Sequence, residues 1–569
     1  DPRSPEHGQY GFLQDLMRRV AYETLSRRDR SDRHLAAAAY LEQSSSDEDE
    51  IVEMLASHYL DASTAAPDLP DADAVRRRAC ELLRRAADRA ESLGAPSEAQ
   101  RYCAQAAGLT SVRLEQAELL DRAGEMAYRA AAMGAAVELS ERARSLYEDA
   151  GEAVEAARVL VRLSRIDQIE GRLVAAIEGM ERAHQVLSVE GPAEDLAGLS
   201  AMLGGAHYFA GDVVRAAELA ERALDTAEAL GLPSVLVDAI LVKSMIGASG
   251  RHPEEARGLF QLALELATRH GLRSAASRAC GNLSDLAFRR DRYTAALAHL
   301  EQAGSLARMI GDRRHEWFAL SESCYALYML GRWDDALASF AELPRARLAT
   351  AGTLLSPLSS VLEIHVHRGD LDAARDLFAV YARMEQAADI QEQAVFASAT
   401  ACMLFSDGRH AEAIAAGAQT IELARTLGLD GQDVKQGVMW GLEAAVTLGD
   451  RDRIAELTDW IEAIPPGLRP PSLDGHMRRA RARIAASVEA AHADHVAAVA
   501  QFRSLGMEFW MAVSLLEHAE RLAPVMPEAA EPLVLEASDV FDRLRAVPWL
   551  ARAAAVPVGG ARTAPRLAG

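Results

Sequence analysis

Lysine is almost missing from this chain of 569 residues. Only Lys243 and Lys435 are present, and the other 59 of the 61 basic residues are arginines. A P-loop needs a lysine within a G-x-x-x-x-G-K-[ST] run to hold phosphates, and neither lysine has that context. We therefore predict that the chain has no nucleotide-hydrolysis site of its own.

Aromatic residues are also scarce, at 5% of the sequence, and the five cysteines are odd in number and widely spread. No C-x-x-C pair indicates zinc or redox chemistry, so we expect small packed cysteines in a reducing compartment. No run approaches the ~20 apolar residues that span a membrane. These absences predict a cytoplasmic chain with no membrane partner.

Positive charge is in deficit, because 84 acidic residues against 61 basic ones give a formal net charge of −23. Nonspecific binding to nucleic acids depends on neutralising phosphates with Lys and Arg. We therefore expect no direct nucleic-acid partner, and we interpret the acidic surface as a contribution to solubility.

Catalytic motifs are missing as well. The sequence has no G-x-S-x-G elbow, no H-E-x-x-H helix and no evident pair of metal-binding aspartates. We predict that this chain is not an enzyme and holds neither cofactor nor metal. His492 and His495 lie three apart on an expected helix and could share a metal ion. Because no third ligand is visible, two solvated histidines are the favoured interpretation.

The sequence does contain a regular repeat. Ten anchor positions spaced 37 to 41 residues apart divide most of the chain, namely Gly94, Gly134, Gly171, Gly211, Gly250, Asp291, Gly331, Gly369, Gly408 and Gly449. Alanine is the fifth residue after the anchor in seven of ten cases, and the seventh residue before it is small in seven. Small residues on both sides of a turn let two helices approach closely. A second glycine series lies mostly 20 or 21 residues after each anchor. Since glycine favours the left-handed conformation that ends helices, each unit is predicted to be a pair of antiparallel helices.

This spacing resembles the tetratricopeptide repeat, whose consensus has a small residue seven before the turn glycine and alanines five and twelve after it. The match covers roughly residues 75 to 460, and the units are longer than the usual ~34 residues. The resemblance implies an all-α fold, an α-α superhelix of about 10 to 12 helical pairs. In such a solenoid each pair contacts its neighbours, and a concave groove receives partners.

The first 45 residues do not fit the repeat. The stretch from Tyr10 to Glu42 resembles the end of the winged-helix module that follows the ATPase core in large bacterial regulators of the signal-transducing STAND type. The resemblance is carried by Tyr10, Phe12, Leu16, Arg19, Tyr22, Leu25, Arg30 and His34. Gln14 stands where many members have histidine, so that histidine's role in nucleotide sensing does not carry over to it.

Together with "EIVEMLASHYLDA" after it, the stretch most resembles proteins that combine a class III adenylate/guanylate cyclase domain, an ATPase and a tetratricopeptide array. The resemblance implies a non-catalytic regulatory and protein-interaction solenoid that relays ligand or partner binding to upstream domains, where ATP and Mg would bind. Because the sequence begins in mid-motif, we expect it to be cut from a longer polypeptide. The alternatives are the sensor region of a maltose-activator-type transcription regulator without its DNA-binding domain, and a free-standing repeat adaptor.

Domain boundaries follow from these patterns. The repeat register fades after Gly449, and the stretch from Ile461 to Gly475 carries four prolines, which are excluded from helix interiors. We predict the end of a winged-helix module at 1–45, a linker and first helix at 46–74, the repeat solenoid at 75–463, a Pro-rich hinge at 464–475, atypical helical repeats at 476–548 and a disordered tail at 549–569.

Aromatic residues gather in one repeat of this aromatic-poor chain. Trp317, Tyr325, Tyr328 and Trp333 could anchor a peptide in the groove, and Asn282, one helix earlier, could bond to its backbone. The alternative, which we favour for the rings, is that they fill the core between repeats. The expected partners are a protein, peptide or small-molecule signal in the groove and an upstream ATPase domain. The sequence leaves open whether the chain also forms a homo-oligomer.

Overall fold

The computed structural model describes residues 20, 22–44, 48–249, 252–348, 354–387 and 390–558. Over these ranges the chain is a succession of α-helices with two short 3-10 helices, η1 and η2, and it has no β-strand. Consecutive helices pack against one another and are joined by short turns. The predicted all-α repeat fold is confirmed.

The chain divides into two compact units, Asp1–Ile166 with Gly179–Gly191, and Asp167–Glu178 with Pro192–Gly569. The first unit contains α2 (Arg27–Ser44), α3 (Glu48–Ala65), α4 (Ala72–Ser92), α5 (Pro96–Ala107), α6 (Arg113–Arg129), α7 (Met133–Ala150) and parts of α8 (Ala153–Ile169) and α9 (Leu173–Glu190).

Ion pairs join the first helices of successive pairs in this unit. Arg122 of α6 reaches Glu91 of α4 at 2.9 Å, and Arg162 of α8 pairs with Asp121 of α6. Because their partners lie one repeat away, these arginines hold successive pairs in register.

The second unit continues the pairs. It contains α10 (Ala193–Phe209), α11 (Val213–Leu230), α12 (Pro233–Ser249), α13 (Pro253–Arg269), α14 (Arg273–Arg289), α15 (Tyr293–Met309), α16 (Arg313–Met329), α17 (Trp333–Ala341), α18 (Arg345–Leu348), η1 (Ser356–Ser359), α19 (Val361–Arg368), α20 (Leu371–Val380), η2 (Ala382–Gln386), α21 (Ile390–Ser406), α22 (His410–Leu427), α23 (Gln432–Leu448), α24 (Arg451–Ala463), α25 (Pro471–Ile484), α26 (Val488–Leu505), α27 (Glu508–Leu522), α28 (Pro527–Leu544) and α29 (Val547–Ala554).

The turns within pairs mostly follow the glycine series. Gly211 and Gly331 have φ of 83° and 70°, in the left-handed region that glycine adopts without strain. Two anchors depart from this pattern. The turn predicted at Gly134 is made instead by Ala131, with φ of 58°, and Asp291 takes the left-handed position with φ of 56°.

Small residues sit where helices of a pair come closest, as the sequence predicts. A Cβ atom added to Gly204 of α10 would lie 3.2 Å from the carbonyl oxygen of Ala216 in α11, and Ala216 is buried. A larger side chain at either position would push the two helices apart.

Contacts between distant repeats shape the second unit. Arg290 Nη1 donates to the Gly467 carbonyl at 2.8 Å, and Arg368 Nε donates to the Leu544 carbonyl at 3.0 Å. The backbone N–H of Ser472 donates to Asp291 at 2.7 Å. The residues in these three pairs are 176 to 181 positions apart. One superhelical turn therefore takes about four and a half repeats of ~40 residues.

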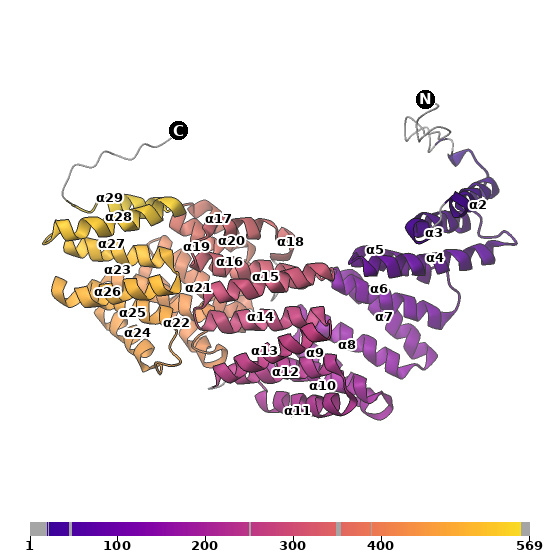
Figure 1. Ribbon diagram of the computed structural model, residues 1–569, viewed down its shortest axis with the longest axis horizontal. Coiled ribbons are helices and arrows are strands. Elements are labelled where there is room, and N and C mark those ends of the chain that lie inside the picture. The colour runs from indigo at the N-terminus through magenta and orange to yellow at the C-terminus, as the bar shows by residue number, and fades with distance from the viewer. Residues whose placement is uncertain are drawn as a thin grey trace. The chain divides into compact units, whose positions relative to one another are not determined.

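The array consequently packs against itself. Three turns within pairs contact turns that connect later pairs: Asp291 meets Ser472, Gly331 meets the turn at Gly506, and Gly369 meets the turn at Ala546. We call this contact the junction. Across it α29 packs against α19 (Figure 1). In a one-dimensional array each pair would contact only its neighbours, so that expectation is wrong for this unit.

The core of the junction is aromatic. The ring of Phe509 lies 5.1 Å from that of Trp333 and 4.2 Å from that of His367, centroid to centroid, and Trp549 lies 5.4 Å from Phe509. Large rings buried in such contacts contribute more than their area alone. These rings therefore stabilise one superhelical turn on the next.

Two predicted boundaries differ from the structure. The Pro-rich segment is a short turn inside the second unit, where Arg469 donates to the carbonyls of Glu462 and Ile464, and Gly467 and Ser472 are bound by α14 and its turn. It therefore does not separate two compact bodies. The predicted disordered tail begins too early, because Trp549 lies in helix α29 and packs on the core. Residues 559–569 of the predicted tail lie outside the described part of the chain.

Gly331→Ala should destabilise the chain more than Gly408→Ala. Both glycines have left-handed φ, 70° and 76°, where alanine is strained by about 1 kcal/mol. A Cβ at Gly331 would also lie 3.1 Å from a Glu508 carboxylate oxygen, whereas one at Gly408 would meet nothing within 4 Å. Urea unfolding should show a loss of about 1 kcal/mol for Gly408→Ala and at least about 2 kcal/mol for Gly331→Ala. Equal losses would argue against close packing at the junction.

Candidate functional site

Three motif residues of the predicted winged-helix end contact one another in the first unit. The Tyr22 hydroxyl lies 3.0 Å from His34 Nε2, and the Arg30 guanidinium lies 5.0 Å from the centre of the Tyr22 ring. His34 Nδ1 is in turn 3.1 Å from His58 Nδ1 of α3. These three motif residues thus form a compact cluster, which contacts α3 through His58. Tyr10, Phe12, Gln14 and Arg19 lie outside the described residues.

The predicted groove residues lie mostly in the core. Tyr325, Tyr328 and Trp333 are buried, Trp317 packs partly buried against the same core, and Asn282 is half-buried. Tyr325 lies between the rings of Phe288 and Tyr293, whose centroids are 5.4 Å and 6.0 Å away. The three buried rings cannot meet a peptide in this conformation, and their burial fits the alternative that they fill the core.

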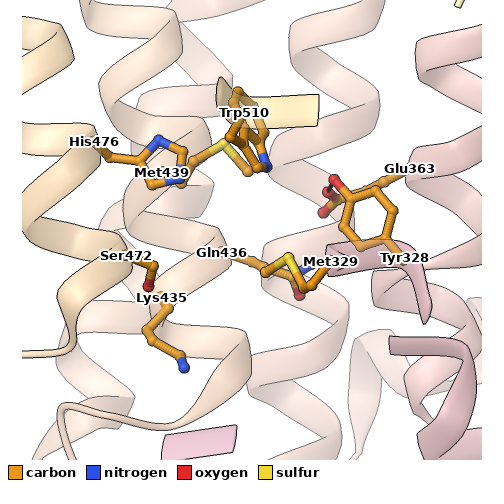
Figure 2. A pocket seen from close by; sticks show the side chains of 9 residues that line it. All are labelled: Tyr328, Met329, Glu363, Lys435, Gln436, Met439, Ser472, His476 and Trp510. Atoms are coloured by element: carbon orange, nitrogen blue, oxygen red, sulfur yellow. Dashed lines mark hydrogen bonds between the residues drawn. The ribbon is translucent and has the colours of Figure 1, made fainter. Parts of the chain in front are cut away.

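Tyr328 does line a cavity at the junction. Figure 2 shows its lining, which comes from α16, α19, α23, α25 and α27 and consists of Tyr328, Met329, Glu363, Lys435, Gln436, Met439, Ser472, His476 and Trp510. The cavity has a volume of about 10 Å³, which is room for roughly one water molecule. A peptide or a metabolite does not fit there, so the cavity belongs to the polar core.

Glu363 is the acid of this cavity. Its carboxylate accepts hydrogen bonds from the Tyr328 hydroxyl at 2.6 Å and from Trp440 Nε1 at 2.9 Å. Burial raises the pKa of Glu363 to about 7, although both hydrogen bonds act in the opposite direction. Gln436 beside it is buried, and its side-chain oxygen has no hydrogen-bond partner. A single bound water could satisfy that oxygen.

A buried ion pair lies at the junction, next to the cavity. Lys435 Nζ lies 2.7 Å from Asp291 Oδ1 and donates to the Phe288 carbonyl at 2.7 Å. Asp291 also accepts from the Tyr293 hydroxyl at 2.8 Å and from the Ser472 N–H at 2.7 Å. The carboxylate thus ties three segments of the chain together. Sequence reasoning missed this pair, although Asp291 is the one anchor that is not glycine and Lys435 is one of two lysines.

A second buried charge network lies between α23, α25 and α27. Arg479 binds Glu517 through two contacts, Nε to Oε2 at 2.9 Å and Nη2 to Oε1 at 2.7 Å. Its Nη1 also lies 2.9 Å from Glu443, and Arg483 contacts Glu443 at 3.0 Å. Burial opposes the charge of Glu517, but the two arginines hold the pKa of its carboxyl below the usual range.

Two carboxylates on the first helices of their pairs have an unusual environment. Glu322 of α16 accepts from the Ser356 hydroxyl at 2.6 Å, and Gln432 of α23 donates to that hydroxyl at 3.3 Å. Burial raises the pKa of Glu322 to about 7. Burial, followed by the charge of Glu322, raises the pKa of Asp433 to about 8. Asp433 Oδ1 has no hydrogen-bond partner.

The two histidines considered for metal binding acquire a third neighbour. His518 of α27 lies 3.1 Å from His492, nitrogen to nitrogen, and stacks on His495 with centroids 5.0 Å apart. Burial lowers the pKa of His495 and of His518 to about 4, so both are neutral at pH 7. Within the described ranges, no three or more His, Cys, Asp or Glu side chains are grouped so that they could hold a metal ion.

Glu363→Gln should flatten the pH dependence of stability. A carboxyl whose pKa is raised in the folded state stabilises the fold fully below its unfolded pKa and loses that contribution as pH rises through the folded value. With a pKa of about 7 in the fold, the change between pH 5.5 and pH 8 is about 2 kcal/mol. Urea unfolding at both pH values should show the wild type losing about 2 kcal/mol more than the variant. If the wild type and the variant lose the same free energy of unfolding between the two pH values, groups other than Glu363 cause the pH dependence.

No helix in the described part of the chain is long and apolar enough to cross a membrane. No protein-family profile matches the sequence, and no curated protein matches it.

Several solved structures match this chain at low sequence identity. Aspartyl phosphate phosphatase F of Bacillus subtilis is 14% identical, with 53% of this chain and 77% of that chain covered and a TM-score of 0.37. A STAND protein with a tetratricopeptide repeat sensor from Pyrococcus horikoshii is 12% identical, with 81% and 68% covered and a TM-score of 0.38. A Rap protein complexed with competence and sporulation factor is 13% identical, with 66% and 99% covered and a TM-score of 0.39. At these identities and TM-scores the matches carry no argument about this chain. Its own succession of packed helical pairs, with small residues where the helices of a pair come closest, is a tetratricopeptide-like solenoid.

Proposed function

We propose that this chain is the regulatory and interaction region of a signal-transducing ATPase of the STAND type. A partner or ligand that carries a positively charged group binds beside Glu322 and Asp433, and its binding biases the junction between two conformations. The ligand can shift such an equilibrium only through its different affinity for the two states. The chain itself performs no chemistry on the ligand.

The observation that carries this proposal is the Asp433 carboxylate oxygen Oδ1, which is buried and has no hydrogen-bond partner. A buried polar atom without a hydrogen-bond partner costs about 1–3 kcal/mol, and Asp433 Oδ1 is such an atom. An ammonium or guanidinium group placed there would supply the missing donor. It would also lower the pKa of both Asp433 and Glu322, because an opposite charge favours the ionised form.

A signal bound at this position would be coupled to the superhelix. Glu322 stands on α16, Ser356 in η1 and Gln432 on α23, and hydrogen bonds connect the three side chains. Gln432 and Ser356 are 76 residues apart in the chain. A ligand that reorders these bonds therefore acts on several repeats at once, next to the junction.

The binding site can be tested by thermal shift of the whole chain. Short basic, neutral and acidic peptides, arginine and a polyamine are the probes, and the double variant Glu322→Gln, Asp433→Asn is compared with Asp372→Asn, whose side chain is exposed. Basic probes should stabilise the wild type and Asp372→Asn but not the double variant. The site is wrong if basic probes stabilise the double variant equally, or if no probe stabilises the wild type.

The attachment to an ATPase and to a class III cyclase rests on the resemblance of the first 45 residues. Support comes from Tyr22, Arg30 and His34, which the motif spaces along the sequence and which contact one another in the fold. The upstream reading frame tests this part. We expect a Walker motif and cyclase aspartates there, whereas a helix-turn-helix segment downstream would favour a transcription regulator.

A further inference from the structure

Three polar side chains are linked inside the aromatic core of the junction. Glu363 and His367 stand four residues apart on α19, so they share one face of that helix. The Tyr328 hydroxyl of α16 lies between them, 2.6 Å from Glu363 Oε2 and 3.4 Å from His367 Nε2. All three side chains are buried. We call them the junction triad.

The junction triad contacts both sides of the junction. The ring of His367 lies 5.9 Å from that of Trp333, centroid to centroid, on the side of the earlier repeats. On the side of the later repeats it lies 4.2 Å from Phe509 of α27 and 6.0 Å from Trp549 of α29. Glu363 and Tyr328 border the cavity (Figure 2).

The Tyr328 hydroxyl has one proton and cannot donate to both of its neighbours. When Glu363 carries a proton, it donates to Tyr328, and Tyr328 donates to His367. When Glu363 is ionised, Tyr328 donates to Glu363 instead, and His367 loses that donor. Among the described residues, the buried carboxylate then has Tyr328 and Trp440 as its two donors.

The other titratable groups around Glu363 are uncharged at neutral pH. Burial raises the pKa values of Tyr325, Tyr328 and the Cys402 thiol of α21 well above their usual range. Burial also lowers the pKa of His367 to about 3 and that of His476 of α25 well below its usual value. The side chains of α27 and α29 here are Phe509, Trp510 and Trp549, which do not titrate.

The cations on the helices around Glu363 are bound to other carboxylates. These pairs are Lys435 with Asp291, Arg368 with Asp334, Arg479 with Glu517 and Arg552 with Glu520. Glu363 itself has a pKa raised by burial to about 7. It is therefore the group of this core whose charge changes near neutral pH.

We propose that the junction triad is a proton-sensitive switch, which keeps the junction closed while Glu363 carries a proton and loosens it when that proton passes to water. A buried carboxylate without a cation is costly and needs water. The cavity beside it holds about one water molecule, and Ser472, His476 and Trp510 of the later repeats form part of its wall. More water enters only if these repeats move away from α19, which also separates Phe509 and Trp549 from His367.

Opening of the junction should increase from mildly acidic to neutral pH. A carboxyl whose pKa is raised in the closed state stabilises that state fully below its usual pKa, and the contribution is lost as pH rises through the raised value. With a pKa of about 7 in the closed state, the opening constant should rise about 30-fold between pH 5.5 and pH 8 and level off at higher pH. This inference does not depend on the ligand site at Glu322 and Asp433, and either can fail alone.

Hydrogen exchange of the whole chain tests the proposal through the protection factors of the α29 amides, which exclude the intrinsic effect of pH on exchange. In the wild type they should fall about 30-fold between pH 5.5 and pH 8. Glu363→Gln should abolish the fall, because its amide donates to Tyr328 as the protonated acid does. His365→Gln is the matched control and should keep the fall. His365 titrates on the same helix but pairs with Asp370.

Tyr328→Phe keeps the proposal testable if Glu363→Gln does not fold. The Tyr328 hydrogen bond lowers the pKa of Glu363, so without it the fall in protection should extend to a pH about one unit higher. A Glu363→Gln chain that shows the fall of the wild type overturns the proposal. A fall confined to exchange that about 1 M urea strongly accelerates overturns it too, because such exchange reports unfolding of the whole unit.

Discussion

Arg479→Met is expected to destabilise the second unit by about 3–5 kcal/mol, because removing one partner of a buried ion pair leaves the other charge unpaired. Arg479 is buried and contacts both Glu517 and Glu443. Without it the pKa of Glu517, now held below its usual range, should rise, and stability should fall further as pH increases. Urea unfolding followed by tryptophan fluorescence measures the loss, and one contributor is Trp510, whose ring lies 5.0 Å from the Arg479 guanidinium.

Arg503→Met is the matched control. Arg503 pairs with Glu536 across neighbouring helices, but both side chains are about half exposed, and exposed pairs contribute little, about 0–1 kcal/mol. The triple change Arg479→Met, Glu443→Met, Glu517→Met should recover much of the loss, since apolar replacement of a whole buried charge network is often neutral. If Arg479→Met and Arg503→Met lose the same stability, the buried network does not stabilise this unit.

Lys435→Met should cost about 3 kcal/mol or more, again by leaving a buried carboxylate without its cation. Asp291 is inaccessible to solvent and would retain only the Tyr293 hydroxyl and the Ser472 N–H. The loss should shrink as pH falls, because an unpaired buried carboxylate takes up a proton at higher pH than usual. Denaturant unfolding at pH 5 and pH 8 measures both effects.

The other lysine is the natural control for this experiment. Lys243 lies 2.7 Å from Glu221, and both side chains are partly exposed, so Lys243→Met should change stability by less than about 1 kcal/mol. The double variant Lys435→Met, Asp291→Asn should lose little more stability than Lys435→Met alone, because the free-energy effects of two coupled residues are not additive. Independent, additive losses would show that Lys435 and Asp291 do not act as a pair.

The helical pairs could be predicted from the sequence because their cause is local. A left-handed residue must end each first helix, and glycine adopts that conformation most easily, so the glycine spacing gave the turns at Gly211 and Gly331 directly. The turn predicted at Gly134 lies three residues earlier in the structure, because Ala131 adopts the left-handed conformation instead. The small positions, such as Gly204 opposite Ala216, were equally local.

The junction could not be predicted in this way. A 40-residue period specifies how one pair follows the next but not the pitch, and the pitch decides which distant turns meet. The sequence therefore left Trp333 as a groove candidate, although Phe509 covers it from a later repeat. Tyr325 is buried against Phe288 and Tyr293 of the adjacent repeat, as the favoured core interpretation expects. Two exceptions in the sequence could have indicated the junction. Asp291 is the only aspartate in the series of glycine anchors, and Lys435 is one of two lysines. Both belong to the ion pair that closes the junction.

A distance measurement between Asp334 and Arg545 tests the central claim, closure of the solenoid onto itself. These residues are 211 positions apart, exposed, and joined by an ion pair at 2.7 Å. Spin labels on cysteines at both positions should give a pulsed-EPR distance of no more than about 25 Å, since two backbones whose side chains form an ion pair lie roughly 10 Å apart and the label tethers add the rest. An array that did not close would separate them by five helical pairs, about 50 Å at ~10 Å for each packed helix. A single narrow distribution near the longer distance would contradict the junction and the proposals built on it.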